Sequence, residues 1–409
     1  MAEKTNAPEI RFEGFTDPWE QRKLGDVATI VGGGTPSTNN GAYWDGDIDW
    51  YSPAELGEQV YADRSVRRIT QAGYDSCSAT LLPAGKTILF TSRAGIGNTA
   101  ILRRSACTNQ GFQSLVMNDG TDVYFVYSMT DRIKKFAERK ASGSTFLEIS
   151  GKGLAAGEFA FPSKDEQTAI GSMFKQLDSL ITLHQRKYDK LCTVKKSMLD
   201  KMFPKPGETE PEIRFEGFTD PWEQRKLGEL CTFAKGSGYG KSDIRESGTP
   251  LILYGRLYTQ YQSRIDEVET FAGPRPGALF SKGREVVVPA SGETAEDIAI
   301  ASSVRRSGII FGGDLNVVVP CRELDPDYVA LGITYGPAHA DLAKRAQGKS
   351  VVHIHASDIA EAILPYPGID EQCALARLTL NLDSLITLHQ RKLDLLKNMK
   401  KSLLDKMFV

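Results

Sequence analysis

The chain contains few of the residues from which metal, redox and hydrolytic sites are built. Its 409 residues include five histidines and six cysteines, and no two cysteines form a CxxC pair. We therefore expect reduced, structural thiols and no metal site. The motifs HExxH and GxSxG and a complete dinucleotide fingerprint are also missing. These absences predict a chain without a catalytic site of its own.

Two short stretches resemble known site motifs. Residues 235–242 read KGSGYGKS, but a phosphate-binding loop needs glycine in place of Lys235, and no strand–loop–helix context is evident around it. We interpret this stretch as a flexible basic loop. His353 and His355 alternate with apolar residues in VVHIHAS, which is more simply read as a strand with one polar edge than as a pair of metal ligands.

Long hydrophobic runs and a strong net charge are missing too. No apolar run approaches the roughly 20 residues that span a bilayer, and the start MAEKTNAPEI is too polar for a signal peptide. We therefore expect a cytoplasmic protein without membrane contact. The formal net charge is −2. That value argues mildly against a nucleic-acid partner for the chain as a whole, although charge can be concentrated locally.

The most informative feature present is a double repeat. Residues 8–25 read PEIRFEGFTDPWEQRKLG, and residues 211–228 repeat them without a change. Residues 177–187 read LDSLITLHQRK and recur as residues 382–392. The intervening residues 29–140 and 232–345 are barely alike. Two similar frames that carry two different inserts indicate a molecule that makes one kind of contact twice, with different content each time.

Two long helices follow the inserts. Ser163 and Glu166 have the spacing of a capping box, and apolar residues then recur every three or four positions up to Met202. The pattern returns from residue 370 to residue 408, so we predict two antiparallel helices that form a coiled coil. We take the two histidines of the stripes as structural or register-setting residues. The residues predicted to pair the helices are Leu177, Ile181, His184, Tyr188, Leu191, Leu382, Ile386, His389, Leu393 and Leu396.

The inserts have a different texture. Short β-type runs alternate with turns rich in glycine, asparagine and proline, as in GGGTPSTNNGAYW at residues 32–44. We expect each insert to be an α+β globule, mostly strand, with long surface loops. The predicted fold class is therefore α+β, with two globular, mostly β domains separated by the two long helices in a pseudo-twofold repeat.

The inserts are suited to binding rather than catalysis. Arginine and lysine neutralise phosphates, whereas arginine, asparagine and glutamine read base edges through paired hydrogen bonds. Such residues are interleaved with aromatic ones in both inserts, and the first also carries Arg67, Arg68 and Arg104. The candidates for DNA contact are Thr35, Trp44, Tyr51, Arg64, Arg93, Asn98, Arg103, Asn109, Gln110, Lys235, Tyr239, Lys241, Arg256, Tyr258, Arg264 and Asn316.

The arrangement resembles the specificity subunit of type I restriction-modification systems. The resemblance rests on PEIRFEGFTDPWEQRKLG opening each half, on GGGTPS, and on FPSKDEQTAI and YPGIDEQCAL leading into the LDSLITLHQRK helices. It covers essentially the whole chain. It implies a non-catalytic subunit that reads a split duplex DNA target through two target recognition domains. The resemblance also implies two methylation subunits docked on the long helices, with restriction subunits added.

The same resemblance implies that this chain binds no cofactor. S-adenosylmethionine, ATP and magnesium are expected on the partner subunits. The domain boundaries that we predict are 1–162 for the first target recognition domain, 163–203 for the central helix, 204–212 for a linker, 213–367 for the second target recognition domain and 368–409 for the C-terminal helix. Two other readings remain: a stand-alone DNA enzyme with unusual motifs, and a coiled-coil scaffold that binds only proteins.

Overall fold

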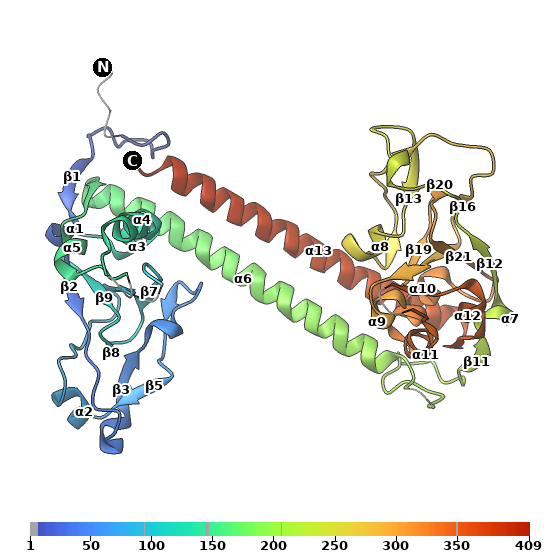
Figure 1. Ribbon diagram of the computed structural model, residues 1–409, viewed down its shortest axis with the longest axis horizontal. Coiled ribbons are helices and arrows are strands. Elements are labelled where there is room, and N and C mark those ends of the chain that lie inside the picture. Colours follow the sequence, from blue (N-terminus) through green and yellow to red (C-terminus); the bar gives the residue numbers. More distant parts are fainter. Residues whose placement is uncertain (1–6, 94, 144–146, 206, 349–350) are drawn as a thin grey trace. The chain divides into compact units, whose positions relative to one another are not determined.

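The computed structural model describes residues 7–93, 95–143, 147–205, 207–348 and 351–409. The chain divides into two compact units (Figure 1). Unit 1 comprises Met1–Gln185 and Arg391–Val409, and unit 2 comprises Arg186–Gln390. Both units combine helices with sheets, which confirms the predicted α+β class. Unit 1 is built from both ends of the chain, because the last nineteen residues, most of which belong to α13 (Ile369–Lys406), group with the first part.

Two long helices run through the chain. Helix α6 covers Lys164–Met202 and begins in unit 1, whereas helix α13 covers Ile369–Lys406 and begins in unit 2. Both helices predicted from the apolar periodicity are confirmed. The Ser163 hydroxyl accepts the N–H of Glu166 at 3.4 Å, which is the first half of the expected capping box. The Glu166 carboxylate instead accepts two hydrogen bonds from Arg11.

The part of unit 1 outside the long helices, here called head 1, contains a five-stranded sheet in the order β2-β9-β6-β7-β4 and a second, three-stranded sheet in the order β5-β3-β8. Its elements are β1 (Glu20–Lys23), α1 (Leu24–Val27), β2 (Ala28–Gly32), β3 (Trp44–Tyr51), β4 (Tyr61–Ala62), β5 (Arg67–Ile69), α2 (Gln71–Asp75), β6 (Thr87–Phe90), β7 (Thr99–Leu102), β8 (Ala106–Thr108), β9 (Gln113–Met117), α3 (Val123–Ser128), α4 (Thr130–Lys140), α5 (Gly151–Ala155) and β10 (Glu158–Phe161).

The corresponding part of unit 2, head 2, has a five-stranded sheet in the order β12-β21-β17-β19-β14 and a second, four-stranded sheet in the order β15-β13-β20-β16. Its elements are β11 (Glu223–Lys226), α7 (Leu227–Leu230), β12 (Cys231–Lys235), β13 (Thr249–Ile252), α8 (Arg256–Thr259), β14 (Arg264–Ile265), β15 (Phe271–Ala272), β16 (Phe280–Lys282), β17 (Glu285–Pro289), β18 (Ser291–Gly292), α9 (Ala295–Ile298), β19 (Ser302–Val304), β20 (Ser307–Phe311), β21 (Leu315–Pro320), α10 (Pro326–Tyr335), α11 (Pro337–Arg345), β22 (Val352–His353), α12 (Ala356–Glu361) and β23 (Ile363–Tyr366).

The repeated N-terminal block makes the same contacts in both units. Its EQRK segment forms β1, which pairs antiparallel with β10, and β11, which pairs antiparallel with β23. The arginine of IRFEG donates two hydrogen bonds to the glutamate of DEQ: Arg11 to Glu166 at 2.7 Å each, and Arg214 to Glu371 at 2.7 and 2.9 Å. Both carboxylates are buried. The repeats therefore form a frame that fastens each head to the start of its own long helix.

The glutamine of the DEQ motif completes this frame. Gln167 accepts the backbone N–H of Asp122 at 3.1 Å, and Gln372 accepts that of Asp325 at 2.9 Å. Asp122 and Asp325 are both N-cap residues: the side chain of Asp122 caps α3, and that of Asp325 caps α10. The junction sequences that support the resemblance are thus explained by the hydrogen bonds between each head and its helix.

The end of each long helix closes the core of the other repeat. Phe408, which follows α13, packs against Trp19 and Phe125 with ring centroids 6.2 and 5.3 Å away. Phe203, which follows α6, packs against Trp222 and Tyr328 at 6.5 and 5.7 Å. Each unit therefore needs the start of one long helix and the end of the other to complete its aromatic core.

Candidate nucleic-acid interface

The second sheet of head 1 holds an exposed arginine against two buried tryptophans. Trp44 and Trp50 on β3 lie edge to face, with ring centroids 5.1 Å apart. The guanidinium of Arg67, on the neighbouring strand β5, lies 3.5 Å from the centre of the Trp44 ring. Stacking on an indole holds an arginine in one orientation while leaving its N–H groups available. In Figure 1, β3 and β5 lie at the end of unit 1 that is farthest from α6.

The turn before β5 is held by two carboxylates. Asp49 accepts hydrogen bonds from the backbone and hydroxyl of Ser65 at 3.2 and 3.0 Å, and Glu55 accepts the backbone N–H of Val66 at 2.6 Å. The turn therefore presents Arg64 and Val66, both exposed, on a fixed backbone. A turn whose backbone is already ordered loses less conformational entropy on binding than a mobile one.

The loop GGGTPS lies against the loop that precedes β9. A Cβ atom on Gly33 would lie 2.2 Å from the carbonyl oxygens of Thr108 and Asn109, so only glycine fits there. Thr35 donates to the side chain of Gln110, and Asn109 accepts the N–H of Gly111 at 2.8 Å. Three of the predicted contact residues are thus brought together by close backbone packing.

In head 2 a comparable arrangement lies in the loops that pack against the second sheet. The guanidinium of Arg275 lies 4.8 Å from the centre of the Tyr239 ring and pairs with Asp243. The hydroxyl of Tyr239 donates to the carbonyl of Gly273 at 3.1 Å. Lys241 is exposed beside this cluster, in a single 3₁₀ turn. Residues 235–242 are therefore followed by no long helix, consistent with our rejection of a phosphate-binding loop.

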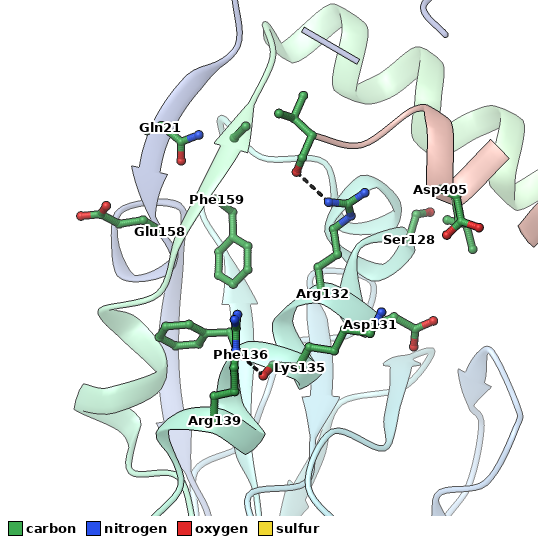
Figure 2. A pocket seen from close by; sticks show the side chains of 13 residues that line it. Gln21, Ser128, Asp131, Arg132, Lys135, Phe136, Arg139, Glu158, Phe159 and Asp405 are labelled. Atoms are coloured by element: carbon green, nitrogen blue, oxygen red, sulfur yellow. Dashed lines mark hydrogen bonds between the residues drawn. The ribbon is translucent and has the colours of Figure 1, made fainter. Parts of the chain in front are cut away.

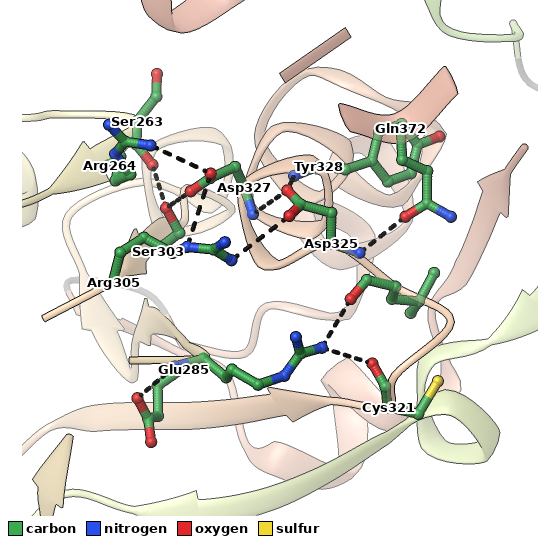
Figure 3. Close-up of polar contacts among 12 residues, drawn as sticks. Ser263, Arg264, Glu285, Ser303, Arg305, Cys321, Asp325, Asp327, Tyr328 and Gln372 are labelled. Atoms are coloured by element: carbon green, nitrogen blue, oxygen red, sulfur yellow. Dashed lines mark hydrogen bonds and ion pairs between the residues drawn. The ribbon is translucent and has the colours of Figure 1, made fainter. Parts of the chain in front are cut away.

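A buried carboxylate organises the back of head 2 (Figure 3). Asp327 accepts a hydrogen bond from Ser303 and lies 3.5 Å from Arg264 and 4.0 Å from Arg305. Burial raises the pKa of Asp327, while the Ser303 hydrogen bond and the two arginines oppose that shift. Arg264 also pairs with Asp266 at 3.0 Å. Both guanidinium groups in this network are thus used within the fold.

The other predicted DNA contacts differ in how they are placed. Trp44, Tyr51, Tyr239 and Asn316 are buried, and Asn316 donates to the carbonyl of Ile354 at 3.0 Å. The half-buried residues are Thr35, Arg93, Asn98, Asn109, Arg256, Tyr258 and Arg264. The exposed residues are Arg64, Arg103, Gln110, Lys235 and Lys241. Among these, Arg103 already pairs with Asp63 and lies over the ring of Tyr61.

Sequence reasoning omitted Arg275 and Arg245 from the candidates. Both are exposed, and the guanidinium of Arg245 lies close to the backbone of Gly273. Both lie beside the second sheet: Arg245 bridges to Phe271 of β15, and Arg275 lies over Tyr239, whose side chain packs in the core of that sheet. The only sequence signal at Arg275 was the turn GPRPG, which marks a loop but does not indicate what the loop contacts.

The residues predicted to pair the helices lie on the inner side of each helix, within their own units. In unit 1, Leu177 and Leu396 belong to one apolar core, with Ile181 packed against it. His184 and Leu393 are buried, whereas Tyr188, Leu191, Leu382, Ile386 and His389 are half-buried. In each unit the two helix segments run antiparallel: in unit 1, Phe174 meets Phe408 while Asp178 meets Lys400.

One hollow of about 450 Å³ lies in unit 1 between α4, β10 and the end of α13 (Figure 2). Arg132 spans it and donates to the carbonyls of Phe408 and Val409 at 2.8 and 2.7 Å. Phe136 and Phe159 line one wall with ring centroids 5.8 Å apart. The hollow belongs to the joint that attaches α13 to head 1.

No group of three potential metal ligands occurs among the described residues. The strand predicted for VVHIHAS is shorter than expected. Strand β22 ends at His353, and His355 is the N-cap of α12, so the two histidines do not lie along one strand. Within the described part of the chain, no helix has the length and apolar character that a membrane crossing requires.

Comparisons with known proteins agree with this architecture. Residues 16–192 match the model of the type I restriction modification DNA specificity domain. The MjaIX specificity subunit of Methanocaldococcus jannaschii is 32% identical over 237 residues, which are 55% of this chain and 54% of that protein. The EcoR124I/EcoR124II specificity subunit of Escherichia coli is 27% identical over 188 residues, 42% of this chain and 46% of that protein. The aligned part thus spans about half the length of these relatives.

A solved structure resembles the whole chain. The type I restriction-modification S subunit from M. genitalium has a TM-score of 0.61 at 16% identity, with 98% of this chain and 99% of that chain covered. At this identity the likeness concerns the fold. The resemblance that the repeats indicated is thereby confirmed: residues 16–192 match the type I restriction modification DNA specificity domain, and the chain as a whole has the fold of a type I S subunit.

Proposed function

We propose that this chain is the DNA-reading subunit of a type I restriction-modification complex, in which head 1 and head 2 each read one half of a split duplex target. The observation that carries the proposal is the recurrence of one five-stranded sheet order in two heads of different sequence, one of which matches a DNA specificity domain. Heads that share a framework but differ in their surfaces suit the recognition of two different half-sites.

Base contact is assigned to exposed polar side chains of the second sheets and the adjoining loops. Arginine and lysine reach phosphates or guanine, and glutamine pairs with adenine through two hydrogen bonds. The buried candidates Tyr51 and Tyr239 support these surfaces from within, whereas Asn316 lies on β21 of the five-stranded sheet. The proposed DNA-contacting residues are Arg64, Arg67, Arg68, Gln110, Lys241, Arg245 and Arg275.

The long helices are proposed to dock two methylation subunits. Within the repeated block LDSLITLHQRK, Leu180 and Leu183 of α6 are 44% and 46% exposed, and their counterparts Leu385 and Leu388 of α13 are 44% and 59% exposed. Packing within the chain does not require leucine at exposed positions. Exposed leucine at the same two positions of both copies suits one apolar contact made twice with the same kind of partner.

Chemistry is assigned to the partners. In this proposal the methylation subunits bring S-adenosylmethionine and the transfer to adenine, and restriction subunits add ATP- and magnesium-dependent cleavage. The chain itself holds DNA, and its residues position the target for those subunits. Purified chain supplied with S-adenosylmethionine, ATP and magnesium is expected to leave DNA unmodified.

The test is selection from random duplexes by the chain in complex with methylation subunits. The proposal predicts enrichment of a sequence with two fixed segments separated by a spacer of constant length and free composition. Enrichment of a single continuous segment contradicts two independent heads. Stable assembly with a protein partner but no preference among duplexes supports the protein-binding scaffold instead, and DNA methylation by the chain alone supports the stand-alone enzyme.

A further inference from the structure

An aspartate in unit 1 joins three elements at one point. Asp178 lies on α6 within the repeated block, and its side chain is only 8% exposed. One carboxylate oxygen accepts a hydrogen bond from the ammonium group of Lys400 on α13 at 2.6 Å. The other accepts a hydrogen bond from the hydroxyl of Tyr124 on α3 at 2.7 Å. Burial and this hydrogen bond raise the pKa of Tyr124, which keeps the phenol protonated as the donor.

The equivalent aspartate in unit 2 does the same. Asp383 lies on α13, and one of its oxygens accepts the ammonium of Lys195 on α6 at 2.5 Å. Its other oxygen accepts the hydroxyl of Ser263 at 2.8 Å. Ser263 is buried directly before β14 of head 2. In each unit, one carboxylate therefore joins its own helix, the antiparallel helix and the head.

The positions of the four charges carry information about orientation. Asp383 lies 205 residues after Asp178, and Lys400 lies 205 residues after Lys195. Parallel alignment of the repeats would place aspartate beside aspartate and lysine beside lysine, and like charges repel. Antiparallel alignment pairs each aspartate with a lysine. The charge pattern therefore favours the antiparallel arrangement over the parallel one.

The same pattern selects one register. Lys195 lies seventeen residues after Asp178 on α6, and Lys400 lies seventeen residues after Asp383 on α13. Sliding one helix past the other by one turn, about 5.4 Å, would separate both pairs at once. Apolar stripes alone discriminate poorly between such alignments, whereas buried polar residues are a known means of fixing register in coiled coils.

These two ion pairs are better shielded than an ordinary surface pair. The Lys400 and Asp178 side chains are 25% and 8% exposed, and those of Lys195 and Asp383 are 15% and 29% exposed. The pair Lys201–Glu212, by contrast, has side chains 38% and 55% exposed. Removal of one partner from a shielded pair leaves a poorly solvated charge and is costly, whereas exposed pairs contribute little.

We propose that Asp178–Lys400 and Asp383–Lys195 are positioning residues that fix the orientation and register of α6 and α13 and attach each head to that register. The separation of the two half-sites in the DNA target is then set by these pairs together with helix length. Only this last consequence rests on the proposed function. The effect on the helices is independent of DNA.

A charge-exchange experiment on the full chain tests the register. Asp178→Lys and Lys400→Asp are each expected to lower the unfolding temperature by roughly 10 °C, and the double variant is expected to recover at least half of that loss. Lys401→Asp, an exposed neighbour on the same helix, makes the same charge change and should shift the temperature by no more than about 2 °C. A double variant whose loss equals the sum of the single losses would overturn the proposal.

Mapping of methylated sites tests the consequence for DNA. With methylation subunits present, Asp178→Asn combined with Asp383→Asn should keep both half-sites while the single spacer length becomes a mixture of lengths. A folded, active variant with one unchanged spacer contradicts the positioning role and leaves the proposed function intact. If the unaltered chain with methylation subunits methylates no split target, the proposed function is overturned. The charge-exchange experiment still decides the register of the helices in that case.

Discussion

Head 1 and head 2 share almost no sequence between residues 29–140 and 232–345, yet their five-stranded sheets are the same. In both, four strands pair antiparallel, and the two-residue strand at the edge pairs parallel: β4 with β7 and β14 with β19. The second sheets differ, with three strands in head 1 and four in head 2. The molecule thus keeps one sheet constant and varies the other.

This difference separates support from recognition. The five-stranded sheets supply buried rows such as Ile88–Phe90 and Val286–Val288, where any apolar residue of suitable size and shape preserves the core. The second sheets bring exposed arginines beside aromatic rings, where a change alters the surface without emptying the core. We infer that half-site specificity changes through the second sheets and their loops while the five-stranded sheets stay in place.

The largest effect on this comparison is expected from the aromatic ends of the long helices. Phe408→Ala removes a ring that contacts Trp19, Phe125 and Phe174, and we expect it to destabilise unit 1 by about 3–5 kcal/mol. Phe203→Ala should do the same to unit 2. Hydrogen exchange followed by mass spectrometry assigns the loss to a unit. Equal deprotection of both units by either variant would contradict the division into two cores.

Removal of the repeated ion pairs of the frame is expected to have a smaller effect, equal in the two units. Glu166→Gln and Glu371→Gln keep the shape of the side chain but remove the charge that accepts Arg11 or Arg214. Each should cost about 2 kcal/mol of stability in its own unit. Denaturant unfolding monitored by the fluorescence of Trp19 or Trp222 in single-tryptophan variants measures the two losses. A twofold difference between them would show that the frames are not equivalent.

The smallest effect is expected at the proposed DNA surface of head 1. Arg68→Ala on β5 should weaken binding to the selected duplex by about 1 kcal/mol and flatten the dependence of affinity on salt. Arg139→Ala on α4, which is also exposed, removes the same charge away from the second sheet and serves as the control. Titration of the assembled complex at two salt concentrations decides. Equal weakening by both variants would indicate general charge attraction and no local contact.

Sequence reasoning reached the long helices because their signal is local and periodic. It also reached the frame, since an exact repeat needs no structural knowledge to be seen. It did not reach the partner of Glu166, because the capping box predicted a contact three residues away whereas Arg11 lies 155 residues away in the chain. Contacts of that separation depend on the completed fold.

The sheets and the candidate site were less predictable for a different reason. Strands of two residues, such as β4 and β14, carry no readable alternation. Tyr51 and Tyr239 have the residue type of a DNA contact, and only burial in the fold distinguishes them from exposed aromatic residues. Arg67 and Arg264 are likewise both arginines on short strands, but Arg67 is exposed and lies over a buried indole, whereas Arg264 pairs with two carboxylates.

Two independent heads, held by one repeated frame, are proposed to read the two halves of the DNA target. Exchange of one insert tests this most directly. Residues 29–140 are replaced by the corresponding segment of another specificity subunit, the frame residues being kept, and the sites methylated by the assembled complex are mapped. The account predicts that one half of the target changes completely while the other half stays the same. A change in both halves, or in neither, would contradict it.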